Sequence, residues 1–125
     1  MKRDLQFLLD MLQSAELIMT YMAQRSKDEF IENVQLQDSV IRRLLIIAEA
    51  ARRVSETARQ TLPNISWQEI NGIRNRLVHE YDDVNLNIVW DVVQSEIPSL
   101  IEELMLRIPP EPQSSKVKIY RGNIT

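Results

Sequence analysis

The chain has 125 residues and no cysteine, which fits one domain with a single buried core and excludes a disulfide framework. Its formal net charge of -3 argues against broad, non-specific attraction to nucleic acid, although a local basic face is compatible with it. Because no apolar run reaches the roughly 20 residues of a membrane span and no segment resembles a signal peptide, we expect a cytoplasmic protein without membrane contact.

Apolar residues recur at spacings of three and four, and the chain holds only two glycines, a combination that predicts helices throughout. The first helix should end near Arg25. Ser26 and Glu29 form a capping-box pattern that predicts a short second helix, with Phe30 and Ile31 attaching it to the core. The expected buried stripe of the first helix is Leu5, Leu8, Leu9, Leu12, Ala15, Met19 and Met22.

A third helix should span about residues 36–61 and stop at Pro63, which has no backbone N–H to donate. Ser66 and Glu69 form a second capping-box pattern and predict a fourth helix that carries Arg74 in its middle. The buried positions expected in these two helices are Val40, Leu44, Ile47, Ala51, Val54, Ala58, Ile70, Ile73 and Leu77.

Asn85 is the expected N-cap of a last helix that Pro98 should bend and Pro109 should end. We therefore expect an all-α fold, an antiparallel bundle of four to five helices over residues 1–108. Residues 109–125 have too little apolar content to pack and should form a flexible tail. The last helix should bury Leu86, Val89, Val93, Ile97, Leu100, Ile101 and Leu104.

The run from Arg74 to Tyr81 contains the only histidine and is where we place the chemistry. An imidazole, whose ordinary pKa is about 6.5, transfers protons near neutral pH, and a guanidinium binds a phosphate through two parallel hydrogen bonds. Phosphodiester cleavage needs both functions. The fourth helix should place Asn75 and His79, four residues apart, on one stripe, and Arg74 and Tyr81, seven residues apart, on the neighbouring stripe, so that the four line one shallow surface.

The spacing of Arg74, His79 and Tyr81, taken without other evidence, is more often explained by structural roles than by catalysis. Arg74 would then form a surface ion pair, His79 would lie near a helix C-terminus, and Tyr81 would pack its ring. We expect no metal site, because Glu80 and the two aspartates after Tyr81 provide too few converging ligands beside one imidazole.

Arg74, His79 and Tyr81 reproduce the Arg-x4-His-x-Tyr signature of the HEPN superfamily toxins called HepT, and the chain resembles that family over nearly all of residues 2–107. Ala48 stands where the family usually has glycine, a difference that bears on helix packing and leaves the signature intact. The other segments that carry the resemblance are residues 37–44, 47–51, 63–67, 89–90 and 97–98.

The resemblance implies a homodimeric, metal-independent endoribonuclease without a cofactor, acting on RNA as the toxin of a type VII toxin–antitoxin pair. It also implies a separately encoded antitoxin, a minimal nucleotidyltransferase of the MntA type that transfers AMP from ATP to Tyr81. One histidine supplies only half of an acid–base pair, so a symmetric dimer would bring two His79 side chains to one cleft. Arg74 would stabilise the phosphorane, and Asn75 would orient the phosphate or His79.

Two alternatives remain open at the sequence level. The domain could be a noncatalytic nucleotide- or substrate-binding subunit of a nucleotidyltransferase, or a purely structural helical dimer. The complete signature favours the nuclease, because a passive subunit would not need a titratable group beside a phosphate-binding one. Exposed helix arginines are commonly solvated or paired with glutamate, but we take Arg42, Arg43 and Arg76 as candidate RNA contacts, with Arg52, Arg53 and Arg59 as a wider basic rim.

Overall fold

The computed structural model describes residues 2–78 and 83–108, so the expected tail at residues 109–125 lies outside the described residues. Within these ranges every named element is a helix, which confirms the all-α prediction. In chain order the elements are α1 (Lys2–Met22), α2 (Lys27–Glu32), α3 (Val34–Arg53), α4 (Glu56–Gln60), α5 (Trp67–Asn71), α6 (Ile73–Leu77), α7 (Leu86–Asp91), the π-helix η2 (Val92–Glu96) and α8 (Ile97–Arg107).

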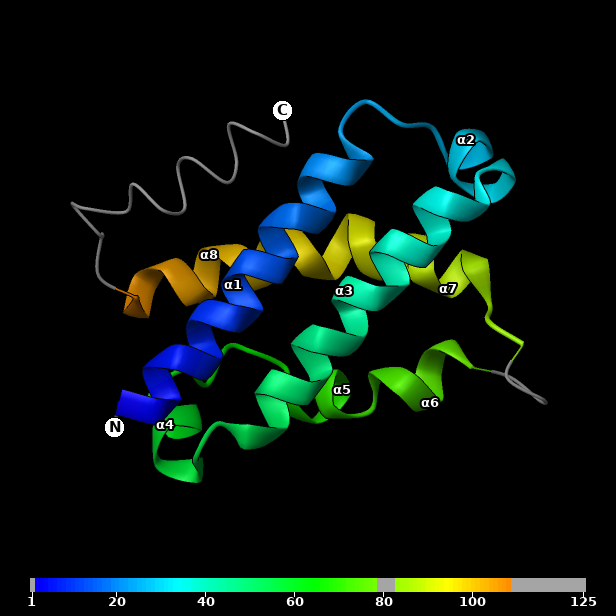
Figure 1. Cartoon of the computed structure of the whole chain (residues 1–125). Helices are drawn as coiled ribbons and strands as arrows, with labels where there is room; N and C mark the ends of the chain where they lie inside the picture. The colour runs from blue at the N-terminus through cyan, green and yellow to red at the C-terminus, as the bar shows by residue number, and fades with distance from the viewer. Residues whose placement is uncertain (1, 79–82, 109–125) are drawn as a thin grey trace.

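The centre of the fold is a pair of long helices, α1 and α3, which lie side by side and run in opposite directions (Figure 1). A third helical run, formed by α7, η2 and α8 without a break, crosses this pair on one side (Figure 1). The short helices α5 and α6 pack against α3. The core lies between these layers, and its largest fully buried side chains include Met11, Ile18, Leu44, Ile47, Ile97 and Leu104.

The buried face of α1 differs from the predicted one. Leu5 was expected in the core but is 41% exposed, whereas Met11 and Ile18 are completely buried. Apolar residues cover more than one face of this helix, so periodicity alone cannot decide which face turns inward. Packing against both α3 and α8 selects the stripe Leu8, Met11, Ala15, Ile18 and Met22.

The short second helix forms as predicted. The Ser26 hydroxyl accepts a hydrogen bond from the Glu29 N–H at 3.1 Å, and the Glu29 carboxylate accepts one from the Ser26 N–H at 2.8 Å. Phe30 is completely buried and its ring lies 6.0 Å from that of Trp90, whereas Ile31 is 39% exposed. Phe30 is therefore the buried side chain by which α2 packs on the core.

The predicted third helix is interrupted, so the expectation of one helix to residue 61 is wrong. Helix α3 ends at Arg53, Val54 is extended with ψ 133°, and Ser55 caps the separate helix α4 by accepting a hydrogen bond from the Ala58 N–H. The residue that follows the break is held by a residue far away in sequence. Asp4 at the start of α1 accepts hydrogen bonds from the Ser55 N–H at 2.8 Å and the Ser55 hydroxyl at 2.7 Å.

The predicted fourth helix is also divided. It begins at Ser66 as expected, but the capping box does not form, because Ser66 has ψ 72° where the capping serines Ser26 and Ser55 have ψ 164° and 157°. Gly72, a poor helix former, separates α5 from α6. Arg74 is therefore the second residue of a short helix, although the core positions Ile70, Ile73 and Leu77 are buried as predicted.

The last helix begins as predicted, because the Asn85 side chain accepts hydrogen bonds from the N–H groups of Asn87 and Ile88. Pro98 does more than bend it. A proline in an α-helix crowds the carbonyl four residues earlier and leaves it without a donor. The turn before Pro98 widens into the π-helix η2, in which the Ile97 N–H donates to the Val92 carbonyl. Within the predicted stripe, Leu86 and Ile101 are only half-buried.

None of the described helices combines the length and the apolar character that crossing a membrane requires.

The contact between Asp4 and Ser55 should make stability depend on pH. Hydrogen bonds from the Ser55 N–H and hydroxyl lower the pKa of Asp4 below its ordinary value of 3.8. A lowered folded-state pKa stabilises the fold above the ordinary value, and this stabilisation is lost as pH falls through the lowered one. We expect Asp4→Asn to reduce the free energy of unfolding at neutral pH and to flatten its dependence on acidic pH, measured by urea unfolding.

The matched control is Asp38→Asn, which changes an exposed aspartate on α3. Equal effects of the two substitutions would show that the Asp4 contact contributes nothing specific.

Candidate active site

Helix α6 carries the first two residues of the predicted site. Arg74 and Asn75 are exposed on its surface, while Ile73 and Leu77 are 2% and 1% exposed beneath them. A helix of five residues is not stable by itself, so its position depends on this packing. The two polar side chains therefore stand on the solvent side of a helix that is fixed to the core from below.

Helix α6 ends at Leu77, so the predicted helix does not continue through Val78. Val78 is extended, with ψ 126°, although its N–H still donates to the Arg74 carbonyl at 3.1 Å. No continuous helix therefore joins Asn75 to the position of His79. His79 and Tyr81 lie outside the described residues.

The chain on either side of the signature residues is joined at its base. Val78 and Val84 form an isolated antiparallel bridge, and the Asn85 N–H donates to the Leu77 carbonyl at 2.8 Å. Asn85 also caps α7. The end of α6 and the start of α7 are thus tied together, and His79 directly follows Val78 in the chain.

Arg76, predicted as an RNA contact, is engaged within the fold. Its two terminal nitrogens donate to the two carboxylate oxygens of Glu96 at 3.1 and 2.7 Å, a bidentate geometry. These hydrogen bonds raise the pKa of Arg76. Contact with RNA stays a prediction for Arg76, and it would require the guanidinium to leave this pair.

No motif or periodicity in the sequence marks Glu96 as a site residue. In the sequence it is one polar residue of the run Gln94-Ser95-Glu96, directly before Ile97 and Pro98. Its partner is 20 residues away in the chain, and no periodicity connects the two.

The other arginines predicted to contact RNA or to form the basic rim have different surroundings. Arg52 and Arg53 both pair with Glu49, and the hydrogen bond from Arg53 is the main cause of the lowered pKa of that carboxylate. Arg59 lies 5.8 Å from the ring centroid of Trp67. Arg42 is exposed on α3, and a terminal nitrogen of Arg43 lies 3.5 Å from the Ser14 hydroxyl.

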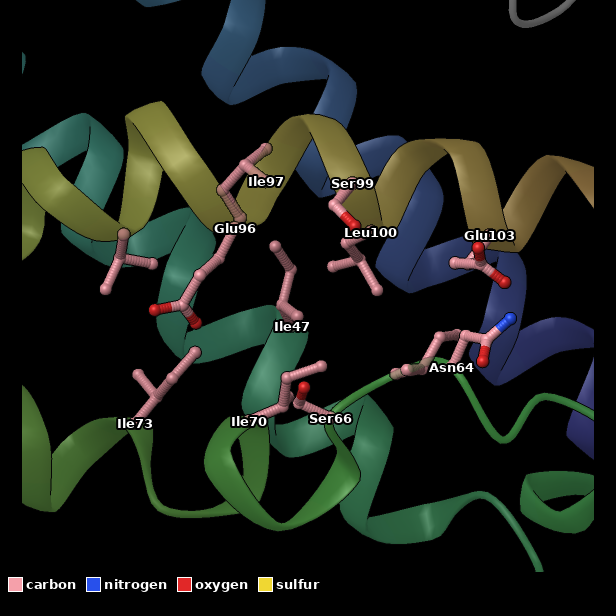
Figure 2. Close-up of a pocket in the computed structure, with 12 residues that line it drawn as sticks. Ile47, Asn64, Ser66, Ile70, Ile73, Glu96, Ile97, Ser99, Leu100 and Glu103 are labelled. Carbon is pink, nitrogen blue, oxygen red and sulfur yellow. The ribbon is translucent and has the colours of Figure 1, made fainter.

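A cavity of about 50 Å³ lies beside Glu96, between α5 and α8 (Figure 2). Its floor is apolar, with side chains such as Ile47 and Ile70, and Asn64 and Glu103 stand at its rim. Ligand pockets usually measure about 300–1,000 Å³, so this cavity is too small for a nucleotide. It contains neither Arg74 nor Asn75, and we do not place the reaction there.

Comparison with known proteins points to one family. Residues 11–106 match the family described as "Ribonuclease HepT-like". A Methanocaldococcus jannaschii protein named "Putative RNase MJ1380" is 36% identical over 104 residues, which cover 82% of this chain and 95% of that protein. A Thermococcus cleftensis protein named "Probable ribonuclease HepT" is 33% identical over 94 residues, 75% of this chain and 86% of that protein. No solved structure matches significantly.

Proposed function

Because the chain belongs to the HepT-like ribonuclease family, we propose that it is an endoribonuclease that cleaves RNA without a metal ion, using Arg74 and His79. The observation that carries the proposal is the placement of Arg74 and Asn75. Both are exposed on α6, directly before the bridge between Val78 and Val84 that closes the base of the signature segment. The guanidinium of Arg74 and the attachment point of the only histidine thus belong to one short segment that is fixed to the core, which supports a joint role in binding and cleaving a phosphodiester.

The chemistry follows from the substrate. RNA contains its own nucleophile, the 2′-hydroxyl, which attacks the adjacent phosphorus and displaces the 5′-oxygen. The neutral imidazole of one His79 takes the 2′-hydroxyl proton, and the imidazolium of a second His79 gives a proton to the leaving 5′-oxygen. The products are a 2′,3′-cyclic phosphate and a free 5′-hydroxyl. Arg74 stabilises the charge on the phosphorane, and Asn75 orients the phosphate.

Each chain has one histidine, whereas the reaction uses an acid and a base at the same time. A symmetric dimer resolves this, because a two-fold axis brings the same residue of both copies to one cleft. We therefore propose a homodimer whose composite cleft contains both copies of His79.

Tyr81 is the proposed point of control. A separately encoded nucleotidyltransferase would transfer AMP from ATP to its hydroxyl, releasing pyrophosphate. The added phosphodiester is anionic and bulky, so beside Arg74 and His79 it would repel RNA and fill the cleft. The chain would then be the toxin of a toxin–antitoxin pair.

The first prediction concerns cleavage itself. In the presence of EDTA, the purified chain should cut a mixed RNA pool and leave 2′,3′-cyclic phosphate ends. Loss of a general acid–base group should slow cleavage by on the order of 100- to 10,000-fold in His79→Ala. Arg74→Ala should also be impaired, and Arg107→Ala, which changes an exposed arginine at the end of α8, should resemble wild type.

Equal rates for wild type and His79→Ala would contradict the assigned role of the histidine. A folded wild-type chain that cuts no RNA, but binds the nucleotidyltransferase, would favour the noncatalytic binding subunit.

The second prediction concerns the composite cleft. When wild-type and His79→Ala chains are co-expressed in equal amounts, random pairing makes roughly one quarter of the dimers fully wild type. Activity per dimer should fall to that fraction if both histidines are required. Activity of one half would show instead that each chain holds a complete site.

The third prediction concerns control through Tyr81. Incubation with the partner nucleotidyltransferase and ATP should add the mass of AMP to wild type and abolish its cleavage of RNA. Tyr81→Phe should stay active and unmodified after the same treatment, because it lacks the acceptor hydroxyl. Mass spectrometry and RNA cleavage on the same samples provide the two readouts, and AMP addition to Tyr81→Phe would place the modification elsewhere.

A further inference from the structure

We propose that Arg76 and Glu96 are positioning residues, which hold α6 in the one orientation that directs Arg74 and Asn75 at the substrate phosphate. This inference rests on the proposed ribonuclease function and assigns a role to two residues that the proposed reaction leaves without one. The observation behind it is the bidentate contact between the guanidinium of Arg76 and the carboxylate of Glu96.

The geometry of α6 explains why such a contact is needed. Five residues rising by about 1.5 Å each form little more than one helical turn. The apolar side chains beneath, Ile73 and Leu77, hold the helix on the core, but apolar contacts have no directional preference and restrict small rotations about the helix axis less tightly than paired hydrogen bonds do. Arg76 and Arg74 are two residues apart on this turn, so any rotation that displaces one side chain displaces the other equally.

The bidentate contact between Arg76 and Glu96 resists this rotation. Two parallel hydrogen bonds between planar groups fix both the distance and the angle between them. The pair is also partly shielded from water, since the two side chains are 33% and 34% exposed, against 60% and 48% for the surface pair of Arg53 and Glu49. Shielding weakens the screening that makes surface pairs contribute little.

The π-helix determines where Glu96 points. Glu96 is the last residue of η2, and Figure 2 shows its carboxylate directed away from that helix and toward Ile73 at the start of α6. A π turn accommodates one more residue than an α turn, which changes the direction of the side chains on one side of it by about 100°. The widened turn before Pro98 therefore brings this carboxylate to α6.

The main alternative role for Arg76 is a direct contact with RNA. Substitution of Glu96 distinguishes the two roles. If Arg76 positions α6, removing the charge of Glu96 should impair cleavage as much as removing Arg76. If Arg76 binds RNA, the loss of Glu96 should leave cleavage intact or improve it, because the guanidinium is released.

The experiment compares Arg76→Gln, Glu96→Gln and the exchanged double variant Arg76→Glu with Glu96→Arg. Glu49→Gln, which breaks the exposed pair on α3, is the control. The readouts are kcat and KM for RNA cleavage in EDTA, the thermal unfolding midpoint, and hydrogen exchange of the α6 amides. Misplacement of Arg74 should lower kcat by on the order of tenfold to a hundredfold in both single variants.

In the same single variants, KM should stay near the wild-type value and the α6 amides should exchange faster. The double variant should recover most of the lost kcat, and Glu49→Gln should match wild type. Recovery in the double variant would show that the pairing itself is required. A residue that only stabilised the fold would change the unfolding midpoint without a selective change in kcat.

Two results would overturn the proposal. In one, Arg76→Gln raises the KM for RNA and weakens the dependence of KM on salt concentration, while Glu96→Gln cleaves normally. That result would make Arg76 an RNA contact. The other is unchanged kcat and α6 exchange in both single variants. If the wild type cuts no RNA, the proposed function fails separately, and the exchange of the α6 amides decides whether the pair orients this helix.

Discussion

The antiparallel packing of α1 against α3 is the contact on which the rest of the structure depends. These two helices supply much of the buried surface, and the other elements are attached to them. Fully burying a Leu, Ile or Met side chain stabilises a fold by about 1.5–3 kcal/mol, so residues such as Met11, Ile18 and Leu44 provide a rigid platform. The helix α3 then carries α5 and α6 on its surface.

The helices become shorter from this platform toward the candidate site. The helix α6 is too short to persist without tertiary contacts, and its attachments differ in kind. Ile73 and Leu77 fix its distance from the core, the pair of Arg76 and Glu96 restricts its rotation, and the bridge between Val78 and Val84 joins its end to α7. A site built this way combines exposed functional groups with buried or paired supports.

The features that could be predicted from sequence are those determined locally. The core positions of α3, among them Val40 and Leu44, follow from helical periodicity, and the cap at Asn85 follows from the residue type. Identical capping patterns had different outcomes, because Ser26 has the extended backbone that a cap requires and Ser66 does not. A short motif predicts where a helix begins better than it predicts the hydrogen bonds formed there.

The features that could not be predicted depend on residues far apart in the chain. The break at Val54 accompanies the contact of Ser55 with Asp4, 51 residues earlier, which no local pattern contains. In the candidate site, the exposure of Arg74 agreed with expectation, but the helix end at Leu77 and the engagement of Arg76 depend on tertiary structure. Glu96 could be recognised only once the fold brought it to Arg76.

The π turn at Val92–Glu96 has a consequence for how this helix can change length during evolution. A π turn is equivalent to a single inserted residue that an α-helix has absorbed without unfolding. Deleting one residue from it would restore continuous α-helix and rotate α7 by about 100° relative to α8, turning Val89 out of the core. Variation in length should therefore be tolerated in the exposed connections and excluded from this segment, although its sequence looks like ordinary amphipathic helix.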